Sequence, residues 1–488
     1  MRLHCPTMSS LRLRSRGPTG WAALVATAAV VAATIAVAPR PPIVVGAVFP
    51  LSGNAAPLAR ETLRGVQLAA DMVNADGGVG GRRLEIDVRD LATAADAPAV
   101  MTAIRADGAS IVIGAYSSDL SVAASEAASA LGLVYWEAGA VADRLTGQGL
   151  ALVFRVGASG TNLGTNSGSF AVGELAPRLG RSASNLRIAI VAAQDDYASS
   201  VADAAARTVT AAGAQIVARI GYPLLAPQFA DLMPTIAAAR PDVLILASHI
   251  PDGVAFRQAM VAAGLHVGAF IGTTMAECDP DFARALGPDV VGVFASDRPV
   301  GGFRPDALNA TARAVYDRFA ARWAKDPASN PQANSGANAA LGWGGAWAPG
   351  SSAGSPYGTA RGGSSVDVPT GASAELTVSG PASTPAWNGP TEEGLSGFTA
   401  AWTLFHDVLP AAAGADAQDV AAAARSMDLA TGSLPNGAGL RFSTDAGTLG
   451  QNTLAAAVIW QWQAVRRYTY VWPATYATGS ITDVPLTR

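Results

Sequence analysis

Charge, lysine, cysteine and histidine are all scarce in this chain of 488 residues. Charged residues make up 14% of it, Lys325 is the single lysine, and the formal net charge is -4. Because such a chain has no broad basic field to attract phosphates, we expect no nucleic-acid partner. The two cysteines, Cys5 and Cys278, lie far apart in the sequence, so we expect one free thiol in the mature domain and no disulfide.

Motifs of catalysis and cofactor binding are missing as well. The four histidines show no metal-ligand spacing, and neither a P-loop nor a Rossmann glycine motif follows the first predicted strand. Residues 350–354 (GSSAG) match a nucleophile pattern, but they lie in a low-complexity stretch without the strand and helix that this pattern requires. We therefore expect no enzyme activity, no metal and no cofactor.

An export signal is the clearest feature of the N-terminus. Four arginines between residues 2 and 16 precede an apolar run at 21–38. Residues 36–38 (AVA) fit a cleavage site, whereas Pro39 directly after them disfavours cleavage, and the run is just long enough to span a bilayer. Residues 1–42 are therefore predicted to be a signal peptide or a retained anchor. The remaining chain is expected outside the cytoplasm.

From residue 43 onward, short β-branched runs alternate with alanine-rich stretches of helical period. The first set of predicted strands lies at 43–49, 83–90, 111–115, 134–137 and 152–156. The second set lies at 186–192, 215–222, 243–247, 270–272 and 290–295, with later strands at 455–463 and 468–472. This alternation predicts an α/β fold with two Rossmann-like lobes and parallel sheets, whose strands would present their carboxyl ends to a shared ligand site.

The lobe boundaries follow from these two sets. Lobe 1 is predicted to combine 43–156 with 297–434, and lobe 2 to combine 157–296 with 435–476, leaving a tail at 477–488. The lobes would be joined by crossover hinge segments. A stretch rich in Gly, Ser and Pro at 327–393 breaks the alternation, so it is predicted to be an irregular insertion in lobe 1.

Several motifs along the chain recur together in one known family. They include 46–53 (GAVFPLSG), 64–69 (RGVQLA), 74–82 (NADGGVGGR), 113–118 (IGAYSS) and 471–479 (VWPATYATG). In this order they resemble the leucine/isoleucine/valine-binding type of periplasmic solute-binding protein of ABC transporters. The resemblance covers most of 43–327 and the end of the chain.

The resemblance implies the type I periplasmic binding protein fold and the function of an ABC importer's solute-binding protein. Such a protein closes two lobes on a small polar ligand, here an amino acid, amide or related amine, and delivers it to a permease in the membrane. We expect a monomer. The alternative is a ligand-sensing receptor domain held by an uncleaved N-terminal anchor.

Four candidate ligand contacts lie in lobe 1. Ser117 and Ser118 follow a predicted strand and precede a helix, where hydroxyls and free backbone N–H groups can bind a carboxylate. The alternative is that Ser118 merely caps the helix, although the resemblance places a ligand carboxylate there. Glu137 ends the next strand, before a loop with Gly139, so its carboxylate is expected to pair with the ligand or with a protein arginine.

Lobe 2 supplies Tyr197, His249 and Thr274, each of which follows a predicted strand. Relatives in the family carry a threonine where this chain has Val141, and an acidic residue where it has Thr274. Both contacts to an α-amino acid are therefore weakened. If Glu137 contacts the ligand in exchange, that ligand carries an amine, guanidine, amide or hydroxyl donor and does not rely on a carboxylate. The identity of this ligand stays open.

Overall fold

The computed structural model describes residues 40–486 except 54, 279, 326–388 and 466. The predicted export segment up to residue 39 and most of the predicted insertion lie outside the described residues. Residues from Ile43 onward form one compact unit, which is the subject of the following description. Among the described residues, no helix combines the length and the hydropathy needed to cross a membrane.

The first sheet is parallel throughout and has the strand order β2-β1-β3-β4-β5. Its strands are β1 (Ile43–Phe49), β2 (Leu84–Asp90), β3 (Ile111–Gly114), β4 (Val134–Glu137) and β5 (Val153–Arg155). The helices around it are α2 (Ala56–Ala75), α3 (Ala97–Ala106), α4 (Ser118–Ala130), α5 (Arg144–Gly147), α12 (Ala310–Lys325), α13 (Glu392–Trp402), α14 (Leu409–Ala411) and α15 (Ala417–Ser426). Because helices cover both faces, β1, β3, β4 and β5 are almost fully buried, whereas the edge strand β2 alternates apolar and charged residues.

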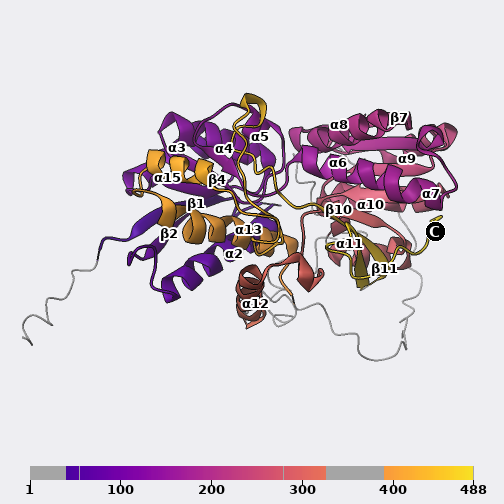
Figure 1. Ribbon diagram of the computed structural model, residues 1–488. Coiled ribbons are helices and arrows are strands. Elements are labelled where there is room, and N and C mark those ends of the chain that lie inside the picture. Colours follow the sequence, from indigo (N-terminus) through magenta and orange to yellow (C-terminus); the bar gives the residue numbers. More distant parts are fainter. Residues whose placement is uncertain (1–39, 54, 279, 326–388, 466, 487–488) are drawn as a thin grey trace, which may run out of the picture. The chain divides into compact units, whose positions relative to one another are not determined.

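Alternate residues of β1 face two separate cores. Val45 and Ala47 belong to the core on the side of α2 and α13, whereas Val48 packs with Met101 and Ile104 of α3 on the other side. Figure 1 shows α13, from late in the chain, beside α2 from its beginning. A Cβ at Gly65 would lie 2.2 Å from the carbonyl oxygen of Gly394, so glycine is what permits this close approach.

The second sheet has the order β12-β11-β10-β9-β8-β6-β7, with β6 to β10 parallel and the last two strands antiparallel. Its strands are β6 (Arg187–Ala193), β7 (Gln215–Tyr222), β8 (Val243–Ala247), β9 (Ala269–Thr273), β10 (Phe294–Asp297), β11 (Val458–Ala464) and β12 (Arg467–Trp472). Its helices are α6 (Gly160–Phe170), α7 (Ala176–Arg178), α8 (Asp196–Ala211), α9 (Phe229–Ala239), α10 (Ile250–Ala262) and α11 (Pro280–Leu286).

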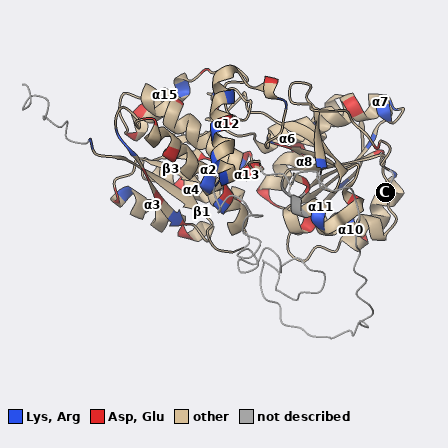
Figure 2. Ribbon diagram, turned by 90° about the horizontal axis from the view of Figure 1, so that it is seen from below, with Lys and Arg blue, Asp and Glu red and all other residues tan. Residues whose placement is uncertain are grey.

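The α/β fold with two parallel sheets is thus confirmed. The predicted bounds of β4, β7 and β8 coincide with those observed, whereas β10 begins four residues later than predicted, at Phe294. The reason is local: residues Gly287–Val290 form a 3-10 turn, and Gly292 takes a φ of +92°, which an extended strand cannot include. Figure 2 shows acidic and basic residues interspersed over the helices around both sheets.

Candidate functional site

The carboxyl end of β3 leads directly into α4 and carries the two predicted serines. Ser117 is the N-cap residue of α4 without a side-chain capping bond, and its hydroxyl is half-buried. The Ser118 hydroxyl accepts a hydrogen bond from the backbone N–H of Ala142, at 3.2 Å. Ser118 therefore connects the start of α4 to the loop after β4. Its predicted contact with a ligand stays a prediction.

Glu137 lies at the end of β4 and turns its carboxylate back onto the following loop. Its Oε1 accepts the N–H groups of Ala138, Gly139 and Ala140 at 3.0, 2.6 and 2.7 Å. Its Oε2 accepts the Tyr135 hydroxyl at 3.1 Å. The side chain is fully buried, and this burial raises the pKa of Glu137 although the hydrogen bonds favour the ionised form. In this structure its hydrogen-bond donors are three backbone amides and the Tyr135 hydroxyl, and the charge of Arg155 also acts on it, while contact with a ligand stays a prediction.

Arg155 braces the same loop from the end of β5. Its Nη1 donates to the carbonyl oxygen of Ala142 at 2.7 Å, and its Nε donates to Gln451 Oε1 at 2.6 Å. Burial lowers the pKa of this guanidinium to about 10. The loop is thus held by a buried carboxylate on its N–H groups and by a buried guanidinium on its carbonyls, which makes it a rigid edge.

Tyr197, from the first turn of α8, joins the ends of two strands in the second sheet. Its hydroxyl lies 2.9 Å from the carbonyl oxygen of Ser248, after β8, and 3.2 Å from that of Thr273, at the end of β9. The next residue, Thr274, has a φ of +61°, and its backbone N–H donates to the carbonyl oxygen of Ser296 at 2.8 Å. A β-branched residue in the left-handed region is strained, and such strain is frequently found at binding sites.

His249 forms an ion pair next to Tyr197. Its Nε2 lies 2.7 Å from Asp195 Oδ2, and its ring contacts the Tyr197 ring with centroids 4.9 Å apart. Burial alone would lower the pKa of His249, but the hydrogen bond and charge of Asp195 raise it above its usual value. Tyr197, His249 and Thr274 are therefore gathered at one edge of the second sheet.

The two groups of predicted residues are connected by contacts between α4–α5 and α6–α8. Arg144 of α5 forms an ion pair with Asp196 of α8 at 3.2 Å, and Thr161 of α6 donates to both carboxylate oxygens of Asp143. Asp119, in the first turn of α4, has a raised pKa because of partial burial and the nearby charges of Asp195 and Asp196. The start of α4 thus lies within electrostatic range of the edge that carries His249.

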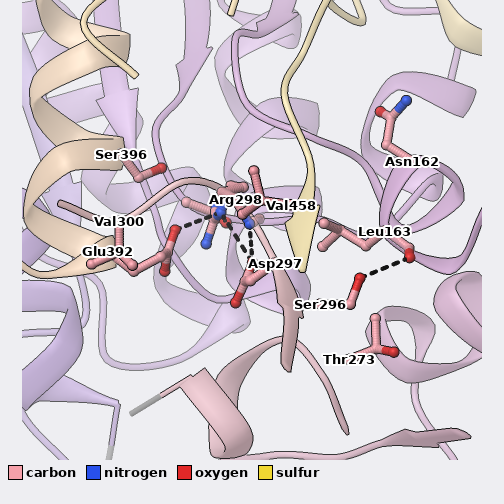
Figure 3. Close-up of polar contacts among 12 residues, drawn as sticks. Asn162, Leu163, Thr273, Ser296, Asp297, Arg298, Val300, Glu392, Ser396 and Val458 are labelled. Atoms are coloured by element: carbon pink, nitrogen blue, oxygen red, sulfur yellow. Dashed lines mark hydrogen bonds and ion pairs between the residues drawn. The ribbon is translucent and has the colours of Figure 1, made fainter. Parts of the chain in front are cut away.

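Arg298 connects the end of β10 to elements of the first sheet, as Figure 3 shows. Its Nη1 donates to the carbonyl oxygen of Gly139 at 2.6 Å, and its Nε lies 2.6 Å from Glu392 of α13. Asp297 accepts the backbone N–H of Arg298 at 2.7 Å. A Cβ at Gly139 would come 2.9 Å from the Cα of Tyr116, so glycine is needed there for close packing.

Sequence reasoning missed two acidic residues and one aromatic residue at these edges. Glu277, in the turn after β9, and Asp297, the last residue of β10, are both buried. Tyr116, two residues after β3, has a φ of +76° and lies near the charge of Arg298. The available signal was position alone: Asp297 ends β10, and Tyr116 and Glu277 lie two and four residues after the ends of β3 and β9, on the side where ligands bind in parallel sheets.

Two hollows near the edge strand β7 of the second sheet are lined by none of these residues. One of about 640 Å³ lies between α8 and β7 and is lined by Asp203, Arg207 and Arg219 among others. None of the predicted ligand contacts lines it. We therefore take as the candidate site the carboxyl ends of the strands in the two sheets, where Ser118 and Tyr197 lie, and not this hollow.

Two mainly parallel sheets, each with polar residues after the carboxyl ends of its strands, are the arrangement of two-lobed binding proteins. Residues 42–359 match the family model described as periplasmic binding protein, and the chain belongs to this family. The predicted resemblance is thereby confirmed, and the family is one of binding proteins, as expected from the absence of catalytic motifs.

Individual relatives agree with this assignment. Leu/Ile/Val-binding protein homolog 8 of Brucella abortus (strain 2308) is 33% identical over 254 residues, which are 52% of this chain and 63% of that relative. The chain therefore matches less than two thirds of that relative's length.

Solved structures show the same fold. A periplasmic binding protein type 1 from Bordetella pertussis Tohama I has a TM-score of 0.63 at 16% identity, covering 88% of this chain and 99% of its own. A leucine binding protein from Thermotoga maritima MSB8 has a TM-score of 0.62 at 15% identity. The match covers 88% of this chain and 98% of that protein.

Proposed function

We propose that this protein is the extracytoplasmic solute-binding component of an ABC importer, which closes two lobes on a small polar ligand and delivers it to a membrane permease. The family match over residues 42–359 carries the proposal. The name of the Brucella abortus relative supports an amino acid or a related amide or amine as the ligand. The export signal before residue 43 supports a location outside the cytoplasm.

Within this proposal Ser118 and Gly139 belong to the half of the site on the first sheet, and Tyr197, His249 and Thr274 to the half on the second. Ser117 contributes a half-buried hydroxyl at the start of α4. Glu137 acts through the loop that it holds, because its carboxylate oxygens already accept backbone N–H groups and the Tyr135 hydroxyl. The crossovers near Gly157 and Ser296 and the chain between Met427 and Leu440 are the proposed hinges.

The test is a thermal-shift screen of amino acids, amides, polyamines and small carboxylates, followed by small-angle scattering. A true ligand should raise the melting temperature further as its concentration increases above the Kd, and it should reduce the radius of gyration. Ser118→Ala should weaken binding at least tenfold, about 1.4 kcal/mol, while Ser129→Ala at the other end of α4 should leave it unchanged. Binding without compaction would contradict closure of the lobes.

One observation favours a second candidate, a membrane-anchored sensor. The apolar run at 21–38 is followed directly by Pro39, a residue that disfavours removal by a signal peptidase. Mass spectrometry of the mature N-terminus separates the two: loss of the first forty or so residues supports a free importer component. An intact N-terminus in the membrane fraction supports the sensor.

A further inference from the structure

The loop after β4 contacts a helix of the second sheet through Asp143, its last residue before α5. Asp143 Oδ1 accepts the backbone N–H of Thr161 at 2.9 Å, and Oδ2 accepts the Thr161 hydroxyl at 2.6 Å. Thr161 is the second residue of α6, so its N–H is one of those for which the helix has no internal acceptor. A carboxylate carried by the first sheet therefore binds at the positive end of a helix dipole on the second.

A second helix of that sheet, α8, is contacted from the same place. The backbone N–H of Asp143 donates to Ser200 Oγ at 3.0 Å. The Ser200 hydroxyl itself donates to the carbonyl oxygen of Asp196 at 2.6 Å, which leaves its oxygen lone pairs for the N–H of Asp143. Arg144, the first residue of α5, adds an ion pair with the Asp196 carboxylate at 3.2 Å. Two adjacent residues of the chain thus contact both α6 and α8.

Both ends of these contacts are anchored in their own sheet. On the side of the first sheet, Glu137 accepts N–H groups of the loop, and Arg155 donates to the carbonyl oxygen of Ala142. On the side of the second sheet, Val201, next to Ser200, is fully buried in the core. Neither the loop nor α8 can therefore yield when one lobe moves relative to the other, and the movement must break the bonds between them.

The covalent chain does not keep α8 beside this loop. Thr161 lies close to the crossover at Gly157, but Asp196 and Ser200 follow only after α6, α7 and β6. The bonds to α8 are therefore the ones that an opening of the lobes about the proposed hinges breaks first.

The bonds of Asp143 should contribute more than the ion pair. Arg144 is 59% exposed and also lies 3.7 Å from Glu126 of α4, so its attraction to Asp196 is largely screened. Asp143 and Ser200 are half-buried. An oxygen that accepts the free N–H groups of a helix N-terminus shifts an equilibrium by about two- to thirtyfold.

We propose that Asp143 and Arg144 form a latch between the lobes, with Thr161, Asp196 and Ser200 as its partners on the second sheet. The latch holds the lobes together before a ligand binds, and its strength sets the fraction of the free protein in the closed form. A ligand that binds the closed form gains apparent affinity in proportion to that fraction. The inference rests on the proposed function, because it takes the lobes to move about the crossovers.

Hydrogen exchange of the Asp143 amide, measured on the purified full chain without any ligand, tests the latch. This amide is bonded across to α8, so it exchanges when the lobes separate. Thr161→Val removes a bond elsewhere in the latch and should speed the exchange about threefold or more. Asp196→Asn should speed it less, because it removes only the screened ion pair. Ser199→Ala is the matched control, since this exposed hydroxyl of α8 takes part in none of these contacts.

Small-angle scattering of the same ligand-free protein reports the lobes themselves. The double variant Asp143→Ala/Arg144→Glu loses the bonds to Thr161 and repels Asp196, so its radius of gyration should increase. Arg178→Glu reverses an exposed charge within the helices of the second sheet and should leave the radius unchanged. Circular dichroism like that of the unchanged chain shows that the increase reflects separation of the lobes and not unfolding.

The latch is refuted if the Asp143 amide exchanges equally fast in Thr161→Val and Ser199→Ala, or if the double variant stays as compact as the unchanged chain. A compound of the wider screen that binds and compacts the protein would then leave the importer function standing without the latch. If the double variant opens as expected but no compound of the screen binds, the latch stands and the proposed function fails.

Discussion

Asp195 and His249 form an ion pair after the carboxyl ends of strands in the second sheet, and each side chain shifts the pKa of the other. Asp195 also caps α8 by accepting the N–H of Ala198 at 2.8 Å, so its carboxylate serves the helix and the imidazole together. Burial would raise the pKa of Asp195, but His249 lowers it below its usual value. Asp195 therefore stays ionised through the range in which His249 titrates.

This pair predicts a stability that depends on pH. Because the pKa of His249 is raised in the folded protein, its protonation stabilises the fold fully below its ordinary value of 6.5. The contribution is lost as pH rises through the folded-state pKa. In Asp195→Asn, burial should lower the pKa of His249 and reverse the slope. Urea unfolding at a series of pH values, with NMR titration of the imidazole, measures both.

The matched control uses the exposed pair of His406 and Asp407, whose atoms Nδ1 and Oδ1 lie 2.8 Å apart. Asp407→Asn should leave the titration of His249 unchanged. If Asp195→Asn also left it unchanged, the ion pair would not exist in solution.

At the scale of elements, α6 and α8 pack through a row of glycines on α6. A Cβ at Gly164 would lie 2.1 Å from the carbonyl oxygen of Val201, and one at Gly168 would lie 2.9 Å from Thr208 Cβ. Because the glycines let α6 lie close to α8, Asn166 of α6 reaches the crossover at Ser296. Its Nδ2 donates to Ser296 Oγ at 2.9 Å. Small residues thus position a whole helix at the proposed hinge.

Gly164→Ala should therefore destabilise the protein by about 1–3 kcal/mol, because the added methyl group must push α8 away. Gly173, in the helical turn Ala171–Leu175, is the control, since a Cβ there would meet no atom within 4 Å. Gly173→Ala should stabilise by about 0.5–1 kcal/mol through helix propensity. Denaturant unfolding of both variants measures the change in the free energy of unfolding, which should fall for Gly164→Ala and rise for Gly173→Ala. Equal changes in the two variants would refute the packing argument.

At the scale of the whole molecule, Arg298 connects elements of the two sheets. It reaches Gly139 after β4 and Glu392 of α13 from the end of β10. The pKa of Glu392 is raised to about 7 by its burial, although Arg298 opposes this shift. The Arg298 guanidinium therefore compensates the cost of burying the carboxylates of Glu392 and Asp297.

Arg298→Gln should lower the free energy of unfolding by about 3–5 kcal/mol, since Glu392 would lose its buried partner. Arg304→Gln, which breaks an exposed pair with Asp306, should cost about 0–1 kcal/mol. Equilibrium unfolding of the two variants makes the comparison. A small loss for Arg298→Gln would mean that the connection between the sheets lies elsewhere.

The sequence by itself determined the fold class, the order along the chain of the strands in both sheets and the family, although not the start of β10. These depend on local signals, namely β-branched runs, helical periodicity and glycine-rich turns, and each is set by neighbours along the chain. The predicted bounds of β4, β7 and β8 therefore match those observed. The sequence also showed which polar residues follow strands, and their role as a ligand site stays a prediction.

Only the tertiary structure decided what each of these side chains contacts. Nothing local to Glu137 reveals that its carboxylate binds the next three N–H groups, or that Glu277 is fully buried against Gly272. The pairing of Arg298 with Glu392 joins residues far apart in the chain. Burial and charge balance arise from the packing of distant segments, so the electrostatics of the site follow from the fold and not from any single motif.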